Sequence, residues 1–163
     1  MAGKALKPKA YSITAADLTV HPELKKSFGY CFYKVAVRMR ASLDKALEEH
    51  NLLIPQLAMM RILDATGPTS QMELGKSTNI DKASVVKFLD GLEKHGYVAR
   101  TGQEKDRRVK LIALTAAGRR MLEKALQVRN RVEKEFLSPL SQSEIESFKK
   151  IIGKLLTDNS PCS

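Results

Sequence analysis

A charged segment at residues 102–108, with the sequence GQEKDRR, contains the side chains best suited to bind a polyanion. Lys105, Arg107 and Arg108 supply its positive charge, and the segment lies between two apolar, strand-like runs. A narrow basic hairpin loop suits the minor groove of DNA, whose negative potential attracts inserted arginine side chains. Because a carboxylate repels phosphate, we expect Asp106 to brace an arginine instead of contacting DNA. Taken alone, the same loop also fits a solvated run of charges.

The segment that precedes this loop, residues 81–94, has a pattern typical of a helix with two different faces. Asp81 is a favoured residue type for an N-cap. One face carries apolar residues at helical spacing, which are Val85, Phe88, Leu89 and Leu92. The other face carries small and basic residues that can approach base edges and phosphates closely, which are Lys82, Ala83, Ser84, Lys87, Gly91 and Lys94. Such a helix beside a basic hairpin loop is predicted to enter the major groove of DNA.

The elements that would position these two segments are mostly helices. Apolar periodicity and capping patterns predict a short helix beginning with the Ser70 capping box, and further helices at residues 22–50, 55–65, 115–137 and 141–158. Two short helices followed by a two-stranded hairpin describe a winged helix-turn-helix. The remaining helices are predicted to frame this unit.

The composition favours a nucleic acid as partner. The chain has 163 residues, and 28 Lys and Arg against 18 Asp and Glu give a formal net charge of +10. No apolar run approaches the roughly 20 residues that span a bilayer, and no secretory leader is visible, so we expect a cytoplasmic protein without a membrane partner. No catalytic triad, paired carboxylates, metal-ligand spacing or cofactor motif is visible, so the sequence predicts no enzyme, no metal and no cofactor.

Two stretches, DKASVVKFLDGLEKHGYVAR and EKDRRVKLIALTAAGRR, resemble the recognition helix, wing and following helix of the MarR family of transcriptional regulators. The resemblance extends over roughly residues 24–156 and is most specific at residues 70–120. It implies that the recognition helix contacts DNA through Lys82, Ala83, Ser84 and Lys87. Many members of the family carry Arg where this chain has Lys87, and Arg or Lys where it has Gly91.

The same resemblance assigns roles in the wing. It implies that Arg108 enters the minor groove, held by Asp106 and by Asp81 at the start of the recognition helix. Lys105 and Arg107 are the further basic residues of the wing. Only one of the two arginines is fixed by the family pattern.

The fold class implied is mainly α (α+β), a winged helix-turn-helix with a two-stranded wing embedded in an all-helical dimerisation frame. The first and last helices carry apolar stripes larger than a small winged unit can cover, which agrees with dimerisation through them. The predicted organisation is a flexible basic arm at residues 1–20, a helical dimerisation region at residues 21–53 and 115–158, a winged helix DNA-binding region at residues 54–114 and a tail at residues 159–163.

The resemblance also implies a mode of action. A homodimer would read a pseudo-palindromic operator in double-stranded DNA, with half-sites about one helical turn apart. The regulator would be a repressor that a small-molecule effector releases, often a small aromatic acid in this family.

Alternatives remain open from the sequence. Cys31 lies between Tyr30 and Tyr33, as in a cysteine redox sensor, but its position favours a buried, inert thiol. The winged unit could instead bind protein or RNA. The three histidines, His21, His50 and His95, lack metal-ligand spacing, and the methionines Met39, Met59 and Met60 suit a core more than a ligand pocket.

Overall fold

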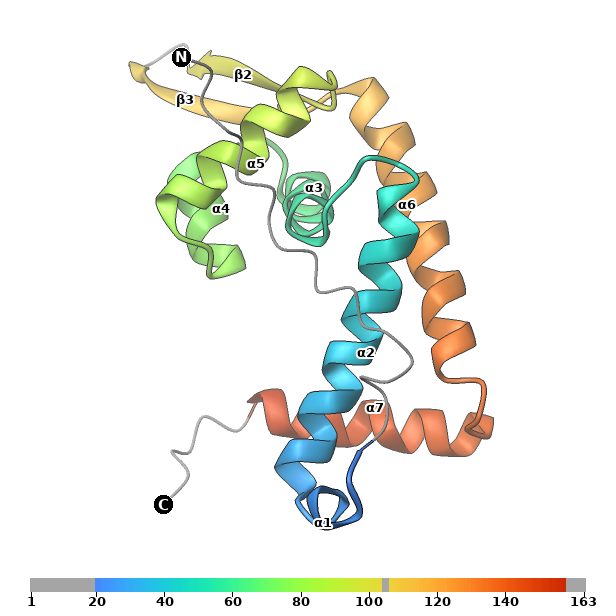
Figure 1. Ribbon diagram of the computed structural model, residues 1–163. Coiled ribbons are helices and arrows are strands. Elements are labelled where there is room, and N and C mark those ends of the chain that lie inside the picture. The colour runs from blue at the N-terminus through green and yellow to red at the C-terminus, as the bar shows by residue number, and fades with distance from the viewer. Residues whose placement is uncertain (1–19, 104–105, 158–163) are drawn as a thin grey trace, which may run out of the picture.

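The computed structural model describes residues 20–103 and 106–157, with the backbone alone at the described positions between 102 and 109. The helices are α1 (Pro22–Lys25), α2 (Phe28–Glu48), α3 (Ile54–Thr66), α4 (Gln71–Thr78), α5 (Lys82–Lys94), α6 (Ala116–Phe136) and α7 (Gln142–Thr157). The strands are β1 (Thr69–Ser70), β2 (Val98–Gln103) and β3 (Asp106–Leu114). Figure 1 shows α4, α5 and the strands together at one end, with α2, α6 and α7 extending away from them.

Most helices begin at the residues that the capping patterns predict. The side chain of Asp81 accepts a hydrogen bond from the Ser84 amide at 3.0 Å, and that of Thr115 accepts one from Gly118 at 2.9 Å. Ser70 caps α4 in the same way, at 3.2 Å from the Glu73 amide. These side chains satisfy amides that the first helical turn leaves unpaired, which explains why the boundaries could be predicted locally.

The predicted first helix at residues 22–50 is wrong in one respect, because the structure divides it. The helix α1 ends at Lys25, and Ser27 begins α2 by accepting a hydrogen bond from the Tyr30 amide at 3.4 Å. The spacing of apolar residues continues unchanged across the break, so it gave no indication that Ser27 begins a new helix.

The sheet also differs from the predicted two-stranded wing. It has three antiparallel strands in the order β1-β3-β2, and β1 pairs Thr69 with Ile112 and Ser70 with Leu111. A strand of two residues has no alternating pattern, so the sequence carried no signal for it. The predicted hairpin is confirmed, with Val98 opposite Leu114 in β2 and β3.

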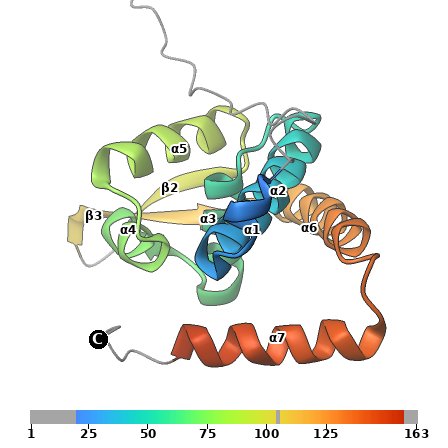
Figure 2. The same cartoon turned by 60° about the horizontal axis from the view of Figure 1, so that its bottom comes forward.

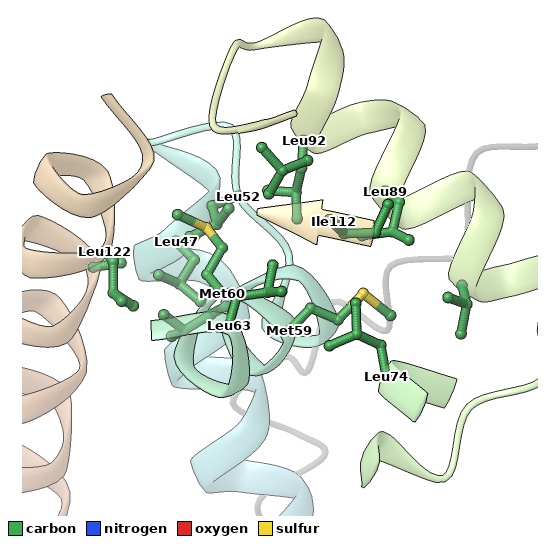
Figure 3. Packing of buried hydrophobic residues seen from close by; sticks show 14 of the residues in the cluster. Leu47, Leu52, Met59, Met60, Leu63, Leu74, Leu89, Leu92, Ile112 and Leu122 are labelled. Carbon is green, nitrogen blue, oxygen red and sulfur yellow. The ribbon is translucent and has the colours of Figure 1, made fainter. Parts of the chain in front are cut away.

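The apolar core joins the winged unit to the long helices. In Figure 3, side chains from α2, α4, α5, α6 and β3 converge on those of α3. The best buried members are Leu47, Leu52, Met59, Met60, Leu63, Leu74, Val85, Leu89, Leu92 and Ile112. Met59 and Met60 are fully buried, which confirms the predicted core position for these two, whereas Met39 is only partly buried.

The helix α7 lies apart from this core. In Figure 1 it runs across the lower turns of α2, past the end of α6, and Figure 2 shows it separated from α2. None of its residues is buried. No helix of the described residues has the length and apolar character needed to cross a membrane.

Candidate nucleic-acid interface

The N-terminal half of α5 presents the predicted small and basic side chains. Lys82, Ala83 and Lys87 are exposed, and Ser84 is partly buried. The predicted inward stripe is confirmed, since Val85, Leu89 and Leu92 are buried and Phe88 packs against the core. The helix therefore turns a face without bulky apolar groups outward, as a helix in the major groove requires.

Asp81 has a clear role in this half of the helix. Hydrogen bonds from the Ser84 backbone, above all, lower the pKa of its carboxyl, so the carboxylate is ionised at neutral pH. An anion at this position also complements the positive end of the helix dipole. The contact that the family resemblance implies, with Arg108, involves a side chain outside the described residues.

The wing is described through its backbone. Gln103 lies opposite Asp106 near the end of the β2–β3 hairpin, with a register irregularity between Gly102 and Gln103. Lys105 lies outside the described residues, as do the side chains of Asp106, Arg107 and Arg108. In Figure 1 the hairpin lies next to α5 and points away from α6 and α7. The two segments predicted to bind DNA are therefore on the same end of the molecule.

The C-terminal half of α5 is joined to the wing by an ion-pair cluster that was not predicted from the sequence. Arg100 of β2 donates to Glu93 at 2.6 Å and to Asp90 at 2.5 Å. The hydrogen bond to Asp90 is the main cause of a raised Arg100 pKa, so the guanidinium stays charged. The sequence pattern that could have predicted it is the spacing of Asp90 and Glu93 on one helix face, followed by a basic residue, Arg100, on the next strand. The cluster fixes the wing relative to the helix.

Gly91 does not belong to the outward face, which corrects the sequence prediction. A Cβ atom at Gly91 would lie 2.7 Å from Nε2 of Gln56 in α3. Position 91 follows Phe88 by three residues and so lies on the same side of α5, and Gln56 of α3 reaches the Phe88 carbonyl there. A larger side chain there would have to displace the Gln56 amide, so position 91 faces α3. Lys94, by contrast, is exposed as predicted.

Cys31 is partly buried, so the prediction of a buried thiol overestimated its burial. Its Sγ lies 3.4 Å from the carbonyl oxygen of Lys25, a weak hydrogen bond back to α1. Tyr33, one of its sequence neighbours, is 61 % exposed. The observed contact of the thiol is thus with the backbone at the α1–α2 break.

The histidines whose contacts are described take part in local structure. Nδ1 of His21 accepts a hydrogen bond from the Glu23 amide at 3.3 Å, and Nδ1 of His95 lies 2.7 Å from the Gly91 carbonyl oxygen. The His95 ring also stacks on Tyr97. Within residues 20–103 and 106–157, no cluster of His, Cys, Asp and Glu has the arrangement of a metal site.

A groove of about 500 Å³ lies between α2 and α6. The guanidinium of Arg38 sits over the Phe136 ring, 5.8 Å from its centroid. Further charged lining residues are Lys45, Glu49, Arg131 and Glu135. The groove is lined by residues of α2, by Glu49 just after it and by residues of α6.

Comparison with known proteins gives consistent matches. The MarR family model matches residues 45–110. The transcriptional regulator HosA of Escherichia coli is 31 % identical over 106 residues, which cover 65 % of this chain and 78 % of HosA. The Bacillus subtilis HTH-type regulator YcgE is 33 % identical over 125 residues, covering 76 % of this chain and 73 % of YcgE.

Solved structures share the fold. A probable transcriptional regulator from Pseudomonas aeruginosa has a TM-score of 0.72 and 29 % identity, covering 81 % of this chain and 98 % of that one. The repressor CouR bound to a 23-mer DNA duplex has a TM-score of 0.76 and 24 % identity, covering 85 % and 98 %. Rv2887, a Mycobacterium tuberculosis MarR family protein in complex with salicylic acid, has a TM-score of 0.67 and 27 % identity, covering 79 % and 96 %.

Proposed function

Because this chain belongs to the MarR family and is a DNA-binding transcriptional regulator, we propose that it reads its operator as a homodimer through α5 and the wing. The main support for this proposal is the placement of α5. Its C-terminal half is held by α3 and β2, while Lys82, Ala83 and Lys87 of its N-terminal half are exposed. Lysine donors reach phosphates, and the small side chains allow close approach to base edges.

We propose that Arg108 reads the minor groove from the wing. Replacing Arg108 with alanine is expected to cost about 1–3 kcal/mol of operator binding and to relax selectivity at one position, because the narrow groove attracts the guanidinium. Lys94→Ala is the matched control. We expect it to lose less DNA affinity, by the same amount on every DNA sequence, and to make the dependence of log affinity on log salt concentration shallower by about one unit. Fluorescence anisotropy with operator variants measures both. An Arg108→Ala protein with unchanged affinity and selectivity would exclude the wing from readout.

A homodimer is supported by apolar surface that the single chain leaves uncovered. On α7, Ile151 is 54 % exposed, Leu155 59 % and Leu156 78 %. Phe28 of α2, at 79 % exposed, stacks on Phe32. Apolar side chains in this number mark an association surface. A two-fold dimer through it would present two α5 helices to half-sites about one helical turn apart.

The effector that we propose is a small aromatic acid bound in the groove between α2 and α6. Arg38 and Arg131 can pair with a carboxylate, and Phe136 offers a ring face. Rv2887 supports this chemistry, since it was solved with salicylic acid.

Salicylate is expected to weaken operator binding, and Arg38→Gln is expected to raise the salicylate concentration needed by about tenfold, because a charge-assisted hydrogen bond is lost. Arg40→Gln on the same helix is the control, since Arg40 instead faces Asp44 at 3.6 Å. Titration of the protein–DNA complex with salicylate measures both. Equal effects of the two substitutions would remove the groove as the effector site.

The first experiment is selection of binding sites from a randomised duplex DNA pool at physiological salt. Recovery of a two-fold symmetric site of roughly 15–20 base pairs would support the dimeric reader. Binding that yields no motif and collapses with salt would contradict it. Competition by double-stranded RNA would then distinguish an RNA-binding module from a DNA reader. The major groove of double-stranded RNA is deep and narrow and excludes a helix, so RNA should not compete with DNA for a recognition helix.

A further inference from the structure

One buried polar side chain joins the recognition helix α5 to α3. Among the described residues, Gln56 is the one polar residue that is buried, at 6 % exposed. Its Oε1 accepts a hydrogen bond from the Leu53 amide at 3.0 Å, and its Nε2 donates to the Phe88 carbonyl oxygen at 3.1 Å. The same amide thus caps the start of α3 and holds the backbone of α5. Both ends of the side chain are satisfied, as a buried amide requires.

Gly91 makes room for this contact. A Cβ atom at position 91 would lie 2.7 Å from Nε2 of Gln56, so any larger residue would push the amide off the Phe88 carbonyl. Glycine inside a helix costs stability relative to alanine, so its presence in the last turns of α5 needs a local reason. The space for the Gln56 amide supplies that reason.

The position of the contact connects it to DNA reading. The carbonyl that Gln56 holds belongs to Phe88, and the residue before it is the exposed Lys87. The remaining contacts between α5 and the core are largely apolar, and apolar contacts have no preferred direction. A hydrogen bond has a narrow range of distance and angle. The Gln56 amide can therefore set where α5 lies along α3, which apolar packing alone does not do.

We propose that Gln56, seated against Gly91, is a positioning residue that sets the location of α5 and thereby operator selectivity. The proposal rests on operator reading by α5, as proposed above. Displacement of the amide leaves α5 folded and basic but places Lys82, Ala83 and Lys87 out of register with their base pairs. Specific binding falls, while the charge-driven attraction to any duplex remains.

The first test compares Gln56→Leu with the wild-type protein on the selected operator and on a scrambled duplex of equal length. Leucine keeps most of the side-chain volume and removes both hydrogen bonds. We expect about tenfold weaker operator binding, from the unpaired buried groups and the shift of α5, with unchanged affinity for the scrambled duplex. A merely structural role would lower the folded fraction and so weaken both affinities equally. Gln127→Leu, on the exposed face of α6, is the matched control and leaves both unchanged.

The second test is a double-mutant cycle with Gly91→Ala. In the wild-type background the added methyl group displaces the amide, so we expect a loss of operator selectivity similar to that of Gln56→Leu. In the Gln56→Leu background no amide remains to displace, so Gly91→Ala adds no further loss.

Additive effects, or a Gln56→Leu protein with wild-type selectivity, would overturn this inference alone. A wild-type protein without preference for any operator would overturn the proposed function, and the inference with it.

Discussion

Replacing Ile151 with glutamate is expected to yield a monomer whose operator affinity is lower by about 10²–10⁴-fold. Ile151 is 54 % exposed in the single chain and lies in the uncovered apolar face of α7. If a second copy covers that face, a carboxylate placed there loses its water without gaining a partner, and the two-fold axis introduces it twice. A monomer then binds one half-site without a second DNA-binding unit held close to the other half-site. The loss of this high effective concentration accounts for the size of the fall in operator affinity.

The control is Gly153→Glu, which adds the same charge to α7 on another side of the helix. A Cβ atom at Gly153 would contact nothing within 4 Å. Sedimentation equilibrium measures the mass of each protein, and anisotropy with the full operator and with a half-site measures binding. A dimeric Ile151→Glu protein with unchanged operator affinity would show that α7 does not form the interface. Equal disruption by both substitutions would indicate an effect of charge instead of position.

The features that the sequence predicted well are those set within a few neighbouring residues. Asp81 and Thr115 cap helices because each side chain reaches an amide three positions ahead, whatever the rest of the chain does. The inward stripe of α5 follows in the same way from helical spacing. The division of the first helix at Ser27 was missed because the apolar spacing continues across it.

The features that could not be predicted depend on which elements become neighbours. Gly91 belongs to the contact with α3 because Gln56, far away in sequence, reaches the Phe88 carbonyl. Arg100 binds Asp90 and Glu93 because β2 folds back beside α5, and nothing at the level of residue types separates this arginine from one that contacts DNA. The candidate interface was thus found from local pattern, while the contacts that hold it in place required the fold.

The outward and inward faces of α5 are expected to respond in opposite ways to truncation. Leu89→Ala should lower the free energy of unfolding by about 2–5 kcal/mol, because Leu89 is fully buried and its removal leaves a cavity in the core around α3. Lys87→Ala, two residues earlier and exposed, should change that free energy by no more than about 0.5 kcal/mol. For operator binding the order reverses, with Lys87→Ala costing about 1–3 kcal/mol through its lost DNA contact.

Urea unfolding measures the first quantity, and anisotropy at a low temperature, where Leu89→Ala is still folded, measures the second. Under those conditions Leu89→Ala should keep more operator affinity than Lys87→Ala, although it is the less stable protein. This separation follows from geometry, since the two side chains leave the same helix on opposite sides. If Lys87→Ala bound the operator as the wild-type protein does, the outward face of α5 would not be the DNA reader, and recognition would have to come from the wing.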